Sequence, residues 1–95
     1  MDVIIAESAK AEVSHAAQYY ENEVGGLGQT FVSYVEKSIS EIEDFPLASR
    51  VFRKDFRRFL IPRFPYGVIY RVAENKIFVA AIMHLKRKPH YWDES

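Results

Sequence analysis

The side chains best suited to chemistry or binding gather near the end of the chain, after Met83. A basic run is followed there by aromatic residues, and the candidate binding residues in this tail are Lys86, Arg87, Lys88, Tyr91 and Trp92. Cationic side chains can hold phosphate groups, and aromatic faces stack on nucleic-acid bases or anchor protein interfaces. The alternative is a solvated charged run with two rings folded back over the edge of a sheet. The composition of the tail thus predicts a surface for an anionic partner.

Arginines further upstream provide additional candidates, namely Arg57, Arg58 and Arg71. Residues 56–61 read Phe-Arg-Arg-Phe-Leu-Ile, which is typical of a β-strand. Successive side chains of a strand point to opposite faces, so at most one of Arg57 and Arg58 lines a given cleft. The sequence therefore predicts that the other arginine is solvated, and it adds Arg57 and Arg71 to the candidate binding residues.

A histidine side chain can donate or accept a proton near neutral pH, which makes His84 a candidate acid or base. In a regular strand His84 shares a face with Phe78, Ala80 and Ile82, and a hydrogen-bonded histidine at the edge of the core is the competing interpretation. The three histidines are scattered along the chain, with no carboxylate at ligand spacing. No metal site is predicted, and no other cofactor is expected.

Charge is segregated along the sequence. The net charge is zero, but residues 1–49 carry nine acidic and two basic side chains, whereas residues 50–95 carry four acidic and eleven basic ones. Such a dipole can direct the C-terminal half towards nucleic acid, an acidic protein segment or phosphate. Solvated surface charge is the alternative interpretation.

Length and composition indicate a single domain over residues 1–95. A chain of this length buries roughly 60–70% of the surface that its unfolded form exposes, which supports a core without metals or disulfides. The absence of cysteine excludes disulfide scaffolds and cysteine nucleophiles, and it fits a reducing compartment, so a cytoplasmic location is expected. The N-terminus does not resemble a secretory leader, and the longest apolar run, residues 77–83, is far below the ~20 residues of a membrane span. No membrane partner is expected.

The apolar pattern predicts a strand followed by two helices in the first half of the chain. Residues 2–6 are short and rich in β-branched side chains, which favours a strand. Ser8 is a candidate cap for a first helix that ends at the glycines of residues 25–26. A second helix is predicted from about residue 27 to the Phe-Pro pair at residues 45–46. The short glycine-bearing link predicts an antiparallel helical hairpin.

Three further strands are predicted at residues 56–61, 66–72 and 77–83. Apolar side chains in residues 66–72 alternate, which places one face of that strand on the core. Residues 77–83 are apolar on both faces, so the last strand is expected to lie inside the sheet. The predicted order is β-α-α-β-β-β, an α+β fold in which an N-terminal helical hairpin packs on a largely antiparallel sheet.

Six short fragments occur in the order found in one protein family, and together they span nearly the whole chain. They are Tyr19-Tyr20-Glu21, Gly26-Leu27-Gly28 followed by Phe31, Phe45-Pro46, Arg57-Arg58-Phe59, the run from Phe64 to Arg71, and His84 with the tail from Arg87 to Trp92. Each fragment alone is weak, but in this order they make the chain resemble the RelE/ParE superfamily of bacterial and archaeal type II toxins. The fold of that family agrees with the predicted order of elements.

The resemblance implies a small toxin held inactive by a cognate antitoxin, whose extended or helical segment wraps it. ParE-like members inhibit DNA gyrase without being nucleases, whereas RelE-like members cleave messenger RNA in the ribosomal A site. The Tyr-Tyr-Glu and Gly-Leu-Gly fragments favour the ParE-like branch. The alternatives are a RelE-like toxin acting on the ribosome and its messenger RNA, and a non-toxic binding module of the same fold.

RNA cleavage of the RelE type has its own chemical requirements. The 2′-hydroxyl attacks the adjacent phosphate, which calls for a base or orienting group, cations for the developing charge and a proton donor. The candidate catalytic residues for this alternative are Arg57, Arg58, His84, Arg87 and Tyr91. In RelE-like nucleases an arginine commonly follows the tyrosine that matches Tyr66, and here that place holds Gly67. Loss of such a cation costs ~3 kcal/mol or more in the barrier, by analogy with oxyanion donors, so Gly67 counts against cleavage.

Overall fold

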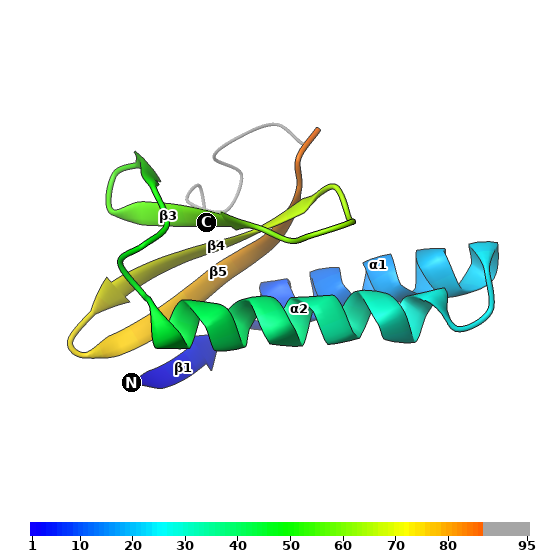
Figure 1. The fold of residues 1–95 in the computed structure, drawn as a ribbon, viewed down its shortest axis with the longest axis horizontal. Coiled ribbons are helices and arrows are strands. Elements are labelled where there is room, and N and C mark those ends of the chain that lie inside the picture. Colours follow the sequence, from blue (N-terminus) through cyan, green and yellow to red (C-terminus); the bar gives the residue numbers. More distant parts are fainter. Residues whose placement is uncertain (87–95) are drawn as a thin grey trace.

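The structure, a computed structural model, describes residues 1–86 as a helical hairpin packed on one face of a β-sheet (Figure 1). The elements are β1 (Asp2–Ile5), α1 (Glu7–Glu23), α2 (Leu27–Asp44), β2 (Val51–Arg53), β3 (Phe56–Leu60), β4 (Tyr66–Ala73) and β5 (Lys76–His84). The helices lie side by side, and in Figure 1 their connected ends extend beyond the sheet on the right. The predicted α+β class is confirmed.

The five strands form one sheet in the order β1-β5-β4-β3-β2. β1 and β5 pair in parallel, and the other neighbouring strands pair antiparallel. β5 therefore lies inside the sheet, as its two apolar faces predicted. The sequence predicted three strands after the helices, but a fourth, the edge strand β2, pairs with β3. Its three residues are too few to show an alternating pattern.

A two-residue turn joins β4 to β5. Pairing continues to Ala73 and Lys76, so only Glu74 and Asn75 lie between the strands. Their φ angles are 54° and 59°, in the left-handed region that both central residues of a type I′ turn occupy. Glycine adopts this conformation without a steric cost, and asparagine adopts it more readily than glutamate. The turn thus sets the register of the two longest strands with residues that are not optimal for it.

Replacing this turn by Asn-Gly, through Glu74→Asn together with Asn75→Gly, is expected to raise the free energy of unfolding by about 1 kcal/mol. The gain comes from relief of the left-handed strain, and urea unfolding measures it. The opposite change, Asn75→Val, is expected to destabilise the protein, because a β-branched side chain at this φ is strained. Equal urea midpoints for the two variants would show that the left-handed conformation of the turn does not limit the stability.

Glu21 organises the link between the helices. Its Oε2 accepts a hydrogen bond from the Gly26 N–H at 2.8 Å, and its Oε1 accepts one from the Gly28 N–H at 3.0 Å. These N–H groups belong to the start of α2, whose N-cap residue is Gly26 and provides no side-chain cap. Gly26 has a φ of 90°, so the turn itself needs glycine at this position. A carboxylate from α1 therefore caps α2 and fixes the angle of the hairpin.

The start of α1 differs from the prediction. Ser8 does not cap this helix, because α1 begins at Glu7 with Ala6 at the N-cap position and no side-chain cap. The Ala6 N–H donates to the Val79 carbonyl oxygen at 2.9 Å, so the chain remains bonded to β5 until the residue before the helix. The direct passage from strand to helix leaves no room for a capping turn at Ser8.

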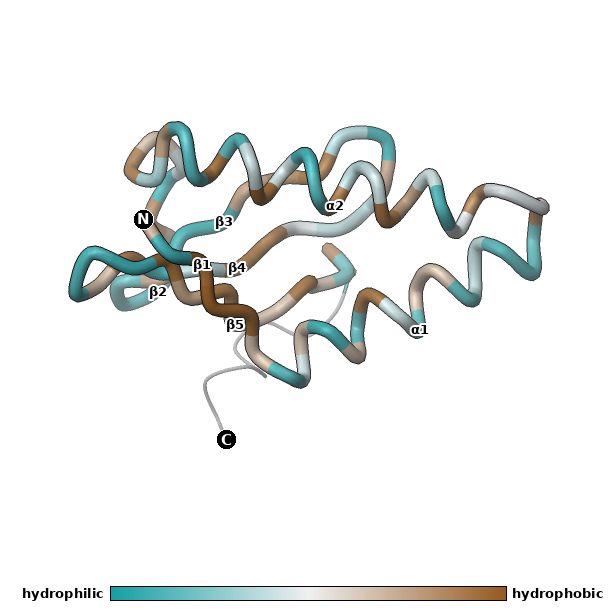
Figure 2. Tube along the Cα trace, turned by 90° about the horizontal axis from the view of Figure 1, so that it is seen from below, coloured by the Kyte–Doolittle hydropathy of each residue, from teal (hydrophilic) through white to brown (hydrophobic). Residues whose placement is uncertain are grey.

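The main core lies between the helical hairpin and the sheet, and Phe31 of α2 is at its centre. Phe31 is fully buried, and its ring centroid lies 5.3 Å from that of Tyr20, 5.1 Å from that of Phe64 and 5.1 Å from that of Tyr66. These rings connect α1, α2, the β3–β4 link and β4. Figure 2 shows hydrophobic positions recurring at intervals along both helices, as the helical spacing in the sequence predicted.

A bulge in β5 changes the alternation of its side chains. Ile69 of β4 pairs with Ala81, but the next residue, Tyr70, pairs with Val79. Ala80 is therefore an extra residue on β5 with no partner opposite it. After this point the side chains of β5 point to the opposite faces from those that a regular strand would give them.

The bulge determines the position of His84. Ile77 belongs to the helix-side core before the bulge and Ile82 after it, so His84 follows Ile82 on the helix side. Phe78 lies on the other face, where it pairs with Arg71 of β4. The prediction that His84 shares a face with Phe78 was wrong, because a regular alternation does not allow for the extra residue.

The face of the sheet away from the helices, here called the outer face, carries a smaller core. Ile69, Ala81 and Met83 are buried there, and Phe52 and Phe56 pack against them. The other predicted alternation is confirmed, since Tyr66, Val68, Tyr70 and Val72 of β4 all contribute to the helix-side core. No helix within residues 1–86 is long and apolar enough to cross a membrane.

Candidate functional site

Arg57 lies on the helix side of the sheet, where it pairs with Tyr70. Its Nη1 donates to the Leu47 carbonyl oxygen at 3.1 Å and to the Ser49 carbonyl oxygen at 2.6 Å. Residues 45–50, here called the link, connect α2 to β2. The guanidinium of Arg57 thus fastens the link to the sheet, which gives this arginine a structural task.

Arg58 and Arg71 lie on the outer face. The Arg58 guanidinium stands 5.3 Å from the centroid of the Phe52 ring, and that of Arg71 stands 5.1 Å from the centroid of Phe78. Arg71 also approaches Asp55 at 3.5 Å. Arg57 and Arg58 therefore point to opposite faces, as the strand prediction required. Two cations, each lying over an aromatic ring, make the outer face a candidate surface for an anionic partner.

Gly67 leaves space that Arg58 uses. A Cβ atom at residue 67 would lie 3.1 Å from Arg58 Cγ and 3.4 Å from Arg58 Cδ. The aliphatic part of Arg58 thus crosses the outer face over Gly67. An arginine at residue 67, as in RelE-like nucleases, would require Arg58 to move, so the two arrangements of cations exclude each other in this conformation.

A cavity of about 310 Å³ lies between α1 and the end of β5. Its lining residues are Glu12, His15, Ala16, Tyr19, Tyr66, Ile82 and His84. The His84 ring meets the Tyr66 ring edge-on with centroids 5.0 Å apart, and His84 Nδ1 accepts the Lys86 N–H at 3.1 Å. Because Nδ1 is an acceptor, a neutral His84 carries its proton on Nε2. The cavity brings His84 next to a tyrosine and a carboxylate, but not next to an arginine of the described strands.

Tyr66 is suited to donate a hydrogen bond rather than to act as a base. Burial raises the pKa of its hydroxyl above the usual value, and the nearby Glu12 carboxylate and Tyr19 raise the pKa further. Glu12 is itself fixed, because its Oε1 accepts the Ile82 N–H at 3.0 Å. At neutral pH Tyr66 is therefore protonated.

The candidate catalytic residues that the structure describes do not converge. Arg57 and His84 lie on the helix side, at different places along it, and Arg58 lies on the outer face. Of the remaining candidates, Lys86 is the last described residue, and Arg87, Lys88, Tyr91 and Trp92 lie outside the described residues. Within residues 1–86 no group of three or more histidine, aspartate or glutamate side chains is placed to hold a metal ion.

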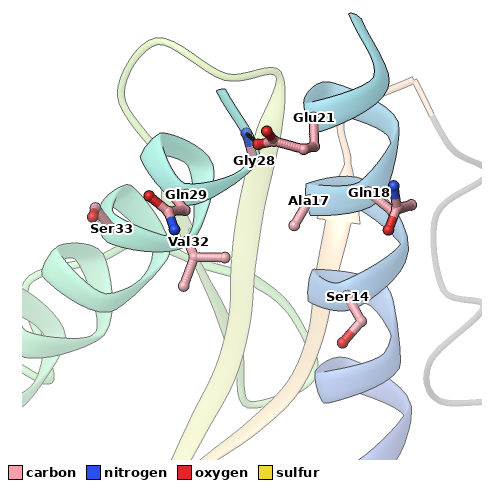
Figure 3. A pocket seen from close by; sticks show the side chains of 8 residues that line it. All are labelled: Ser14, Ala17, Gln18, Glu21, Gly28, Gln29, Val32 and Ser33. Atoms are coloured by element: carbon pink, nitrogen blue, oxygen red, sulfur yellow. Dashed lines mark hydrogen bonds between the residues drawn. The ribbon is translucent and has the colours of Figure 1, made fainter. Parts of the chain in front are cut away.

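A groove of about 680 Å³ runs between the two helices near their connected ends (Figure 3). Small and polar side chains line it, namely Ser14, Ala17, Gln18, Glu21, Gly28, Gln29, Val32 and Ser33. Figure 3 shows Glu21 reaching across the top of the groove to Gly28. The sequence did not predict this groove, although Gly28 of the Gly-Leu-Gly fragment lies where α2 approaches the backbone of α1 closely. The lining holds no basic side chain, so the groove is a candidate surface for a protein segment rather than for phosphate.

The structure sorts the charges by layer. Each helix carries four acidic side chains and one basic side chain, whereas residues 51–86 carry eight basic and two acidic ones. The charge asymmetry along the sequence thus becomes an acidic helical layer and a basic sheet. Electrostatic attraction thus favours the sheet over the helices as a surface for anions.

Comparison with known proteins shows the family to which this chain belongs. A solved chain from the chromosomal ParDE toxin–antitoxin system of P. aeruginosa shares the fold, with a TM-score of 0.70 over 90% of this chain and 97% of that chain, at 15% sequence identity. No curated protein matches the sequence. The family model described as the ParE toxin of the type II toxin–antitoxin system, parDE, matches residues 3–89. The chain therefore belongs to the ParE toxin family of type II toxin–antitoxin systems.

Proposed function

We propose that this protein is a toxin that inhibits DNA gyrase and that a cognate antitoxin neutralises it. The observation that carries the proposal is membership of the ParE family over residues 3–89. In the superfamily that the sequence resembles, inhibition of gyrase distinguishes the ParE-like branch from the ribosome-dependent nucleases. The toxin then acts by binding its target, without cleaving nucleic acid.

The arrangement of the arginines supports a binding mode of action. Stabilising the charge that develops on a phosphate during cleavage requires several donors within hydrogen-bond distance of one site. Arg57 is bonded to carbonyl oxygens on the helix side, and Arg58 and Arg71 lie on the outer face. A protein that inhibits by docking has no need for such convergence.

The basic sheet supports an antitoxin with an acidic segment. Antitoxin tails in the superfamily that the sequence resembles are often acidic, and the outer face carries Arg58 and Arg71 over aromatic rings. We assign the antitoxin surface to Arg58 and Arg71 of the outer face, together with Lys86, which lies two residues after the end of β5. Arg87, Lys88, Tyr91 and Trp92 follow Lys86 in the sequence and are proposed to bind the same partner. Cations held over rings can meet carboxylates while their alkyl stems stay packed.

A RelE-like nuclease is the second candidate, and the cavity at His84 favours it. His84 there adjoins Tyr66, and Arg87 and Tyr91 follow it closely in the sequence. An acid or base at His84 and a donor at Tyr66 would suit proton transfer.

Growth measurements with a His84→Ala variant separate the two candidates. Induced expression of the toxin is expected to stop growth, and the gyrase mechanism predicts that His84→Ala still does so, because inhibition by binding needs no proton transfer at this residue. Co-expression of the antitoxin from the adjacent gene should restore growth. Loss of toxicity in a folded His84→Ala variant would instead support the nuclease. Normal growth when the unaltered chain is expressed would contradict both and would support a non-toxic binding module of this fold.

A further inference from the structure

Three large apolar side chains are exposed at the junction of α2, the link and β2. Phe45 is 66% exposed, Leu47 64% and Val51 44%. Val51 pairs with Arg57, whose guanidinium is bonded to the Leu47 carbonyl oxygen, and the Ala48 N–H donates to the Phe45 carbonyl oxygen, so the backbone of all three residues lies in one region. This region is here called the link patch, and its backbone is the connection that rises from the end of α2 to the β2–β3 hairpin in Figure 1. Clustered apolar exposure of this kind marks interaction sites.

The backbone beneath the link patch is fixed in place. The hydroxyl of the buried Tyr70 donates to the Pro46 carbonyl oxygen at 2.8 Å. Arg57 donates to the carbonyl oxygens of Leu47 and Ser49. A segment held by three hydrogen bonds from the sheet presents its apolar side chains with little conformational entropy to lose on binding. The link patch is therefore preorganised for a partner.

Opposite charges flank the link patch. On one side, the end of α2 carries Glu41, Glu43 and Asp44, and its last turn contains no basic residue. Acidic side chains at a helix C-terminus face the negative end of the helix dipole, which is unfavourable. At the other end of the link, the basic residues Arg50 and Lys54 lie before and after β2. The last turn of α2 thus has acidic side chains and no basic one. The residues on either side of β2 supply two basic side chains.

We infer that the link patch is a self-complementary interface through which two copies of this chain form a two-fold symmetric dimer. A two-fold axis through Leu47 places the acidic end of α2 of one copy against the basic flank of the other, and it does so twice. Phe45, Leu47 and Val51 of the two copies then form the apolar centre. An acidic partner would meet Glu43 and Asp44, and a basic partner would meet Arg50, so a second copy fits the charges better than either.

The inference is independent of the toxin's target. It is tested by sedimentation of the purified full-length chain over a range of concentrations that includes the micromolar range. The chain is expected to form a concentration-dependent dimer, and Leu47→Asp is expected to weaken it by at least about tenfold, because the new carboxylate is buried at the axis. Leu60→Asp is the matched control. Leu60 is similarly exposed, at 55%, but lies in β3 away from the link, so this variant should dimerise as the unaltered chain does.

A charge exchange tests the symmetry of the contact. Asp44→Lys alone and Arg50→Glu alone are each expected to weaken the dimer, because each places like charges opposite one another. The double variant with both substitutions is expected to recover the affinity, since it exchanges the two flanks and restores opposite charges. Asp44→Lys also replaces an acid by a base at the end of α2, so a weaker dimer cannot be attributed to loss of the helix.

A monomer at every concentration would overturn the inference. So would equal weakening by Leu47→Asp and Leu60→Asp, or a double variant weaker than both single variants. If the unaltered chain is monomeric and the antitoxin complex, but not the free toxin, shields Leu47 from solvent, the link patch belongs to the antitoxin, which also overturns the dimer.

Discussion

Replacing Phe31 by alanine is expected to lower the free energy of unfolding by about 3–5 kcal/mol. Phe31 is fully buried and packs against Tyr20, Phe64 and Tyr66, which come from α1, the β3–β4 link and β4. The substitution removes the buried ring and leaves a cavity, and the edge-on packing of the Phe64 and Tyr66 rings against Phe31 disappears as well, which adds to the cost. Because a domain of this size is stable by only about 5–15 kcal/mol, much of its stability rests on this one ring.

Urea unfolding followed by circular dichroism measures this decrease. Leu60→Ala is the control, since it also removes an apolar side chain, but one that is more than half exposed on β3. Its effect is expected to stay within about 0.5 kcal/mol. A decrease below about 1 kcal/mol for Phe31→Ala would contradict the position of Phe31 at the centre of the helix-side core.

Gly28→Ala is expected to destabilise the helical hairpin by about 2–3 kcal/mol, although alanine is the better helix former. A Cβ atom at Gly28 would lie 2.5 Å from the Ala17 carbonyl oxygen and 3.0 Å from Glu21 Oε1. The first of these is a backbone atom of α1, which cannot rotate away, so the helices would have to separate. That movement would also disturb the hydrogen bond from the Gly28 N–H to Glu21.

Gly25→Ala provides the matched control three residues earlier. A Cβ atom at Gly25 would have no heavy atom within 4 Å, and its φ is not in the left-handed region. Thermal unfolding of the two variants should therefore differ clearly, with Gly25→Ala close to the unaltered chain. Equal melting temperatures would mean that the helices can separate at little cost.

The helical hairpin could be predicted from the sequence because its signals are local. Apolar residues at helical spacing set the buried faces of both helices, and Phe31, Val35 and Ile42 are buried as that spacing predicts. The glycines at residues 25 and 26 mark the end of α1. In β4 the alternation of side chains was equally plain. These features depend on residues within a few positions of one another, which a single sequence displays.

The position of His84 could not be predicted, because it depends on pairing between strands. The extra residue Ala80 arises where β5 shifts its register against β4, and nothing in the local composition marks it. The same limit applies to Arg57, whose acceptors, the Leu47 and Ser49 carbonyl oxygens, are 10 and 8 residues away along the chain. Sequence alone predicted that Arg57 and Arg58 point apart, but not that one of them fastens the link.

Gly67 shows how the structure refines a conclusion from the sequence. Its presence suggested only that a catalytic cation is missing. The structure adds that Arg58 packs across this glycine, with its guanidinium over Phe52. The outer face thus has its own arrangement of cations, and this arrangement is what we assign to partner binding.

Gyrase-catalysed supercoiling of relaxed plasmid DNA, measured over a titration of the purified toxin, tests the proposed function most directly. Supercoiling is expected to fall as toxin is added and to recover when the antitoxin is present in excess. Ribosome-bound messenger RNA incubated with the same preparation should remain intact. Unchanged supercoiling at every toxin concentration, together with cleavage of that messenger RNA, would contradict inhibition of gyrase as the function of this protein.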